Sequence, residues 1–188
     1  MKNKKIIILT AFSVLLGAGL IIYYYLKSNT ITPIEFKDSA DMESYIIKQK
    51  EKFKNVNYSI GILEDQTQSK EMRYGAESAL CEIETQNTEA FNSLLTVFSN
   101  KEEKEPNLRY AIAVCFRDNK ELRAVDALIY ALKDNDKMMR FKAAQVLGEL
   151  KIQEAVAPLE NMLKNDSDKT VRANATRSLE MITGNSYK

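Results

Sequence analysis

The stretch ALKDNDKMMRFKAAQVLGEL, residues 131–150, decides the fold, because the chain repeats its pattern about thirty residues later. Residues 162–182, MLKNDSDKTVRANATRSLEMI, again indicate the end of one helix, a short polar turn and a second helix that opens on an arginine. Asp and Asn side chains in such a turn can accept hydrogen bonds from free amide N–H groups, as helix N-caps do. Self-similarity at a fixed period of about 20 to 50 residues predicts stacked repeats.

The same pattern occurs four times along the chain. It is marked by arginines whose positions, by subtraction, are 36, 31 and 32 residues apart: Arg73, Arg109, Arg140 and Arg172. Apolar residues follow each arginine at the third and seventh positions, and an apolar helix precedes each of the last three. A two-helix unit of this size cannot cover its own apolar faces, whereas stacked units share one core. The sequence therefore predicts an all-α protein with about four helix pairs.

This pattern resembles HEAT repeats, and more closely the short subclass named after the phycobilisome lyases, whose repeats run much like A-L-x-D-x-x-x-x-V-R-x-x-A-A-x-A-L-G-x-L. Residues 124–182 carry the best copies, although Met139 replaces the valine. Arg177 breaks the small-residue run of the last copy, which suggests an end cap. The resemblance implies a short HEAT-like α-solenoid over residues 38–188.

A structural role is favoured for the four repeat arginines over a binding role. A guanidinium group can hydrogen-bond a carboxylate in two places at once and is suited to charge networks. We expect each arginine to bond the turn aspartate of its own or the preceding repeat and so brace the stack.

The N-terminus predicts a membrane anchor. Residues 6–26 carry no charge, and this length of 21 residues matches the roughly 20 apolar residues that cross a bilayer. A cleavable signal peptide has a shorter apolar region and a small-x-small site. Lysines within residues 1–5 place that end in the cytoplasm by the positive-inside rule, and residues 27–37 form a linker to an extracytoplasmic domain. The lysine bias is modest, so the reverse topology stays open.

Composition argues against nucleic-acid binding. The chain of 188 residues has a net charge of +1, and removing the four lysines of the anchor region leaves 23 basic and 26 acidic residues, a net of −3. A nucleic-acid binder normally shows a basic excess that meets phosphate. The repeat domain is also long enough for a sizeable core without metals or disulfides.

Catalytic and metal-binding patterns are not found in the sequence. The chain has no histidine, the commonest general base and metal ligand, and no Gly-rich phosphate loop or Cys-x-x-Cys motif. The fragments DNDK and NDSD resemble parts of a calcium loop, but helix N-caps explain them better. Glu102, Glu103 and Glu105 are interpreted as a solvated turn. No enzyme activity, cofactor or metal is expected.

Cys81 and Cys115 are the only cysteines. They fall eight and six residues after their arginines, so they can approach each other without being aligned for a disulfide. The sequence favours two unlinked residues and leaves the disulfide open.

Candidate binding residues lie on the second helix of each pair. At about 100 degrees per residue, positions one, five and eight after the arginine fall opposite the buried face, and Gly148 is one of them. The family resemblance implies that second helices line a concave groove, where an aromatic ladder could bind a peptide. The alternative, which is favoured, is that each ring fills the seam to its neighbour. The groove candidates are Tyr74, Tyr110, Val114, Arg117, Phe141, Gln145 and Arg177.

Together these features predict a single-pass protein of the cell membrane that acts as a protein–protein interaction module, a scaffold or adaptor outside the cytoplasm. Its partners would be another protein and the membrane, through residues 6–26. Two alternatives stay open: an enzyme or chromophore-handling protein similar to the phycobilisome lyases, and a structural subunit of an envelope complex.

Overall fold

The computed structural model describes residues 43–44, 47–48 and 51–187. The predicted anchor and linker, residues 6–37, lie outside this part of the chain. Among the described residues, no helix combines the length and the apolar character needed to cross a membrane.

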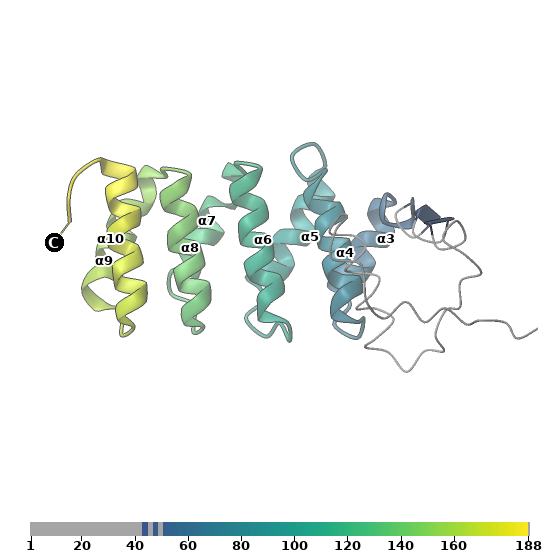
Figure 1. Ribbon diagram of the computed structural model, residues 1–188, viewed down its shortest axis with the longest axis horizontal. Helices are drawn as coiled ribbons and strands as arrows, with labels where there is room; N and C mark the ends of the chain where they lie inside the picture. Colours follow the sequence, from purple (N-terminus) through teal and green to yellow (C-terminus); the bar gives the residue numbers. More distant parts are fainter. Residues whose placement is uncertain (1–42, 45–46, 49–50, 188) are drawn as a thin grey trace, which may run out of the picture.

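The described residues fold as stacked antiparallel helix pairs without a strand, which confirms the all-α repeat architecture. Figure 1 shows the second helices of the pairs as a row of nearly parallel rods, with the first helices behind them. The first helices are α3 (Val56–Glu64), α5 (Thr88–Ser99), α7 (Val125–Ala131) and α9 (Val156–Asn165). The second helices are α4 (Lys70–Cys81), α6 (Pro106–Asp118), α8 (Lys137–Glu149) and α10 (Lys169–Thr183). Short 3₁₀ turns, Leu122–Ala124 and Gln153–Ala155, precede α7 and α9.

The polar turns end where the N-cap interpretation predicts. The Asp136 carboxylate accepts a hydrogen bond from the amide of Met138 at 2.9 Å, and Asp168 accepts from the amides of Thr170 and Val171. These bonds satisfy amide groups that have no partner within the helix. The DNDK and NDSD fragments are therefore helix starts.

The core follows the predicted register. The residues three and seven positions after the arginines are all fully buried: Ala76, Ile112, Ala143, Ala175, Leu80, Phe116, Leu147 and Leu179. Small residues allow the helices to approach closely and large ones fill the space between them. Successive second helices also pack against each other, so the internal second helices α6 and α8 have neighbours on three sides.

Close packing is tightest between α8 and α10. A Cβ atom added to Gly148 would lie 2.7 Å from the Cβ atom of Ser178, nearer than real contacts allow. The outward placement of Gly148 is therefore wrong, because this residue is buried at the seam between two second helices.

Candidate protein-interaction surface

Each of the first three repeat arginines binds the turn carboxylate of the repeat that follows. Arg73 donates two hydrogen bonds to Glu103 at 2.5 and 2.8 Å. Arg140 likewise grips both oxygens of Asp166, at 2.7 and 2.9 Å. These carboxylates belong to the following repeat, which the prediction missed. Among the described residues, the predicted bond to a turn aspartate of the arginine's own repeat is found only through the backbone, where Arg140 donates to the carbonyl of Asp134 and Arg172 to that of Asp166.

Arg109 makes the same link and shows how the arginine also closes its own pair. It donates one bond to Asp134 at 2.7 Å and another, from Nε, to the carbonyl of Phe98 at 2.8 Å. Arg73 bonds the carbonyl of Leu63 in the same way, at 2.9 Å. These carbonyls lie near the ends of first helices, where the backbone lacks intrahelical donors. One side chain thus caps its own repeat and holds the next.

The bound carboxylates share a second bond, to the amide two residues further on. The acceptors Glu103, Asp134 and Asp166 receive these amides at 2.9 Å in all three turns. Burial alone would raise the pKa of Glu103 and Asp134, but the arginine and amide hydrogen bonds outweigh it, so both pKa values lie below the usual range. The interpretation of Glu103 as part of a solvated turn is wrong, because its carboxylate is buried against Arg73.

Arg172 makes the backbone hydrogen bonds within its own repeat but lacks the bond to a following carboxylate in the described residues. Its Nη1 atom donates to the carbonyls of Asp166 and Ser167, at 2.7 and 3.2 Å, as Arg140 does with its own turn. Within the described part of the chain, no carboxylate forms an ion pair with Arg172. The ladder of ion pairs, defined as Arg73–Glu103, Arg109–Asp134 and Arg140–Asp166, therefore has three rungs in the described residues.

The aromatic row Tyr74, Tyr110 and Phe141 lies at the seams between second helices. All three rings are half-buried and pack against the core. The Tyr110 hydroxyl donates to the carboxylate of Asp136, the N-cap of the next second helix. Burial, aided by nearby carboxylates, raises the pKa of Tyr74 to about 12. The three rings are therefore partly exposed residues of the seams, and part of each ring stays accessible to a partner.

Of the other groove candidates, Val114, Arg117 and Gln145 are half-buried and Arg177 is exposed. Arg117 pairs with Asp118 at 2.8 Å and reaches across the seam to Glu149 on α8 at 3.4 Å. Gln145 donates to the same Glu149 at 2.8 Å. Val114 and Arg177 occupy the equivalent position on α6 and α10. We call this set the second-helix face: Tyr74, Tyr110, Val114, Arg117, Phe141, Gln145 and Arg177.

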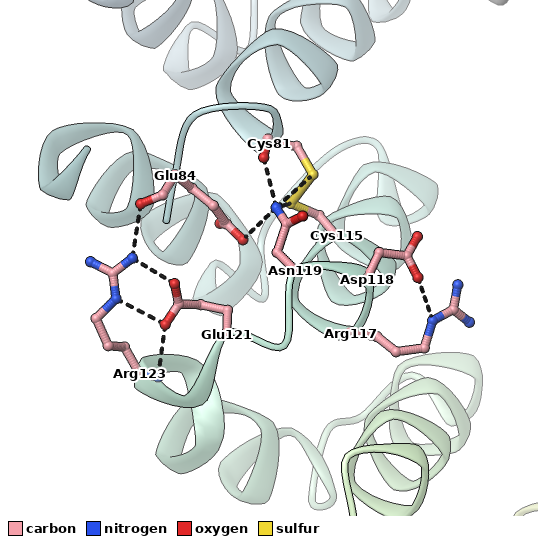
Figure 2. Close-up of a disulfide and its surroundings, with 8 residues drawn as sticks. All are labelled: Cys81, Glu84, Cys115, Arg117, Asp118, Asn119, Glu121 and Arg123. Carbon is pink, nitrogen blue, oxygen red and sulfur yellow. Dashed lines mark hydrogen bonds and ion pairs between the residues drawn. A yellow bond between two sulfur atoms is a disulfide. The ribbon is translucent and has the colours of Figure 1, made fainter. Parts of the chain in front are cut away.

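Cys81 and Cys115 form a disulfide, with Cα atoms 5.9 Å apart. The preference for two unlinked cysteines is therefore wrong. The bond joins the end of α4 to α6, where the side-chain amide of Asn119 donates to the carbonyl of Cys81 at 2.7 Å and to Glu84 at 3.1 Å (Figure 2).

A cluster of charged residues, Glu84, Glu121 and Arg123, lies near this disulfide. Glu84 is fully buried, and its Oε2 atom has no hydrogen-bond partner. Arg123 binds Glu121 and the carbonyl of Glu84, as Figure 2 shows, and its guanidinium lies 4.0 Å from the ring centre of Phe91. This cluster could not be predicted from the sequence, because Glu84 comes from the turn after α4 and Glu121 and Arg123 come from the turn after α6.

Two further features were not found from the sequence. A hollow of about 450 Å³ opens beside Arg140, between the turns that follow α7 and α9, and Leu132, Pro158 and Met162 form part of its lining. Tyr130 on α7 is 63% exposed, with the Lys101 ammonium 4.6 Å from its ring centre. Both features lie away from the second-helix face, and the hollow's arginine is already paired with Asp166.

A model of the HEAT repeat family matches residues 91–180, from within α5 to α10. This segment therefore consists of HEAT repeats, which in general are protein-interaction modules. A comparison with curated proteins gave no match.

Proposed function

We propose that this chain is a membrane-anchored protein-interaction module that presents its HEAT-like solenoid outside the cytoplasm as a scaffold or adaptor. The proposal also includes the absence of enzymatic activity and membership of the phycobilisome-lyase subclass. The observation that carries it is the HEAT-repeat segment itself, residues 91–180, in which the Arg109–Asp134 and Arg140–Asp166 ion pairs link successive helix pairs into one continuous support. Stacked repeats of this kind create extended binding surfaces.

The second-helix face is the surface we assign to the partner. It offers aromatic and arginine side chains on successive helices, and residues of these two types are enriched at protein interfaces. The contact of Tyr110 with Asp136, and those of Arg117 and Gln145 with Glu149, hold these three side chains in place before binding, which lowers the entropic cost of association. A partner would bury the exposed half of each side chain.

Chemical crosslinking in membranes, followed by affinity capture of the full chain, tests the interaction. Val114→Ala combined with Arg177→Ala should reduce capture of the partner at least about tenfold, since an interface anchor contributes on the order of 1–2 kcal/mol. The matched control is Tyr130→Ala, which removes a more exposed side chain from the first-helix layer. Equal capture by all three proteins would reject the second-helix face.

The same preparation separates the alternatives. A partner present in fixed stoichiometry under all conditions would favour a structural subunit, and a new absorbance band after addition of bilin would favour a chromophore-handling protein. An interaction module predicts neither result.

A reporter fused after Lys188 tests the anchor and its orientation. An enzyme reporter that is active only outside the cytoplasm should be active and should remain in the membrane fraction. Activity of a cytoplasm-only reporter would reverse the orientation, and release of a shortened soluble protein would reject the anchor.

A further inference from the structure

An acidic side chain lies directly beside the disulfide. Glu77 precedes Cys81 by one turn of α4, and a carboxylate oxygen of Glu77 and the two sulfur atoms all lie within 4.8 Å of one another. Glu77 is only 7% exposed. No hydrogen bond to its carboxyl group is found among the described residues. Its carboxyl group therefore lies beside the two sulfur atoms with no competing hydrogen bond from these residues.

The two sulfurs differ in access. Cys115 is 2% exposed, within α6, whereas Cys81 is half-buried at the last residue of α4. The amide of Asn119 lies 3.6 Å from the Cys81 sulfur and 3.8 Å from the Cys115 sulfur. An incoming thiol would therefore reach Cys81, and Cys115 would be the leaving group.

A thiolate on Cys115 would be poorly stabilised. The nearby charged groups are Glu84 in the turn after α4 and the Glu121–Arg123 pair before α7. Arg123 is already committed to Glu121 and to the carbonyl of Glu84. Burial raises the cost of a thiolate, and neighbouring carboxylates raise it further. The leaving sulfur therefore needs a proton as the bond breaks.

Glu77 can hold that proton at neutral pH. Burial, together with the charge of Glu84, raises the pKa of Glu77 to about 7. The group is then protonated in much of the population at pH 6 to 7, and a donor with a pKa near the working pH is the most effective one.

We propose that Cys81 and Cys115 form a thiol–disulfide exchange site at which Glu77 is the proton donor. The co-reactant is a dithiol, either small or carried by a protein. One of its thiolates attacks the sulfur of Cys81, a new S–S bond forms, and the Cys81–Cys115 bond breaks. The electron pair stays on the Cys115 sulfur, which takes the proton of Glu77 and becomes a thiol.

The second step releases the reductant in its oxidised form. Its other thiolate attacks its own sulfur in the mixed disulfide, so the dithiol leaves as a cyclic or protein disulfide, oxidised by two electrons. Cys81 leaves as a thiolate and takes a proton from solvent, as does the Glu77 carboxylate. The chain is thereby reduced by two electrons and opens the covalent link between α4 and α6.

The rate of opening by dithiothreitol tests the proposal. In the full chain, held in mild detergent, the rate divided by the thiolate concentration should fall as pH rises through about 7. Glu77→Gln should remove this dependence and slow opening at pH 6 at least about tenfold, a modest share of what general acids contribute. Glu82→Gln is the matched control, because Glu82 is exposed and adjacent to Cys81.

Two results would overturn the proposal. One is a Glu77→Gln protein, shown by its thermal melt to be folded, that opens at the wild-type rate and with the wild-type pH profile. The other comes from single-cysteine variants treated with an aromatic disulfide probe. Cys115→Ser should expose a reactive Cys81, whereas the Cys115 left by Cys81→Ser should react at least about tenfold more slowly, since burial suppresses thiol reactivity. The reverse order would contradict the assigned roles.

Discussion

Arg73 and Glu103 form a buried ion pair across 30 residues of sequence, with each side chain only 1% exposed. The pair joins α4 to the turn between α5 and α6. It is the most deeply buried of the three rungs of the ladder, and the only one of them whose carboxylate is a glutamate. Glu103 belongs to the insertion that lengthens the turn between α5 and α6. The longer turn therefore still places a carboxylate against the arginine of the preceding repeat, Arg73.

Replacement of Glu103 should therefore be severe. Glu103→Ala leaves Arg73 buried without its counter-charge, and loss of one partner of a buried pair costs about 3–5 kcal/mol. The matched control is Glu102→Ala, one residue away and exposed, which should stay within about 0.5 kcal/mol. Denaturant unfolding of both variants measures the difference. Equal stability would show that the pair contributes nothing to the stack.

Arg140 and Arg172 offer a comparison between a complete and an incomplete rung. Arg140→Ala should lower the free energy of unfolding by on the order of 1–3 kcal/mol, because it removes charged hydrogen bonds to Asp166 as well as backbone bonds. Arg172→Ala removes backbone bonds alone and should cost less. Thermal melts rank the two. A larger loss from Arg172 would contradict the ladder as the main source of the arginine contribution.

The aromatic row should contribute to stability. Replacing Tyr74, Tyr110 and Phe141 together by serine should cost clearly more than about 0.5 kcal/mol per site, the usual bound for surface changes, because the rings fill seams. Removal of a fully buried ring would lower the free energy of unfolding by about 3–5 kcal/mol, and removal of a half-buried ring lowers it by less. Ala173→Ser is the control at the same position of the last repeat, where the side chain is exposed. An unchanged melting temperature of the triple variant would instead favour the hypothesis that the three rings project into a groove without filling the seams.

Glu77 should make stability depend on pH. Its pKa is about 7 in the folded chain and near 4.5 in the unfolded one, so the folded state holds an extra proton between these values. Its contribution is thus fully present below about pH 4.5, declines as pH rises and is lost above about 7, a change of roughly 3 kcal/mol. Glu77→Gln should remove this decline and exceed wild-type stability at pH 8. Urea unfolding at pH 5 and pH 8 measures it, and parallel behaviour of the two proteins would reject the shift.

The repeat register could be predicted from sequence because it rests on local spacing. Residues three and seven positions after each arginine face the core through helical geometry alone, and the structure confirms this for Ala143 and Leu147. The resemblance to HEAT repeats was equally accessible, since the turn and arginine recur in order. Nothing beyond short-range pattern was needed for either result.

The partners of these residues depend on three-dimensional order and could not be predicted in that way. Which turn meets an arginine is set by the direction of stacking, so the following repeat was missed. Cys81 and Cys115 differ in register by two positions, yet the offset between α4 and α6 brings them together. A helical projection divides a helix into one buried and one exposed side. A second helix inside the stack, such as α8, has neighbours on three sides, so Gly148 is buried against Ser178 of α10 although the projection places it outward.

Site-specific photo-crosslinking in membranes tests the proposed interaction surface most directly. A photoactivatable phenylalanine analogue is placed in the full chain at Val114 or Gln145 on the second-helix face, and at Asn92 or Tyr130 on exposed positions of α5 and α7. Our account predicts one discrete crosslinked partner from the first two positions and none from the control positions. Crosslinks that form only from Asn92 and Tyr130 would contradict it.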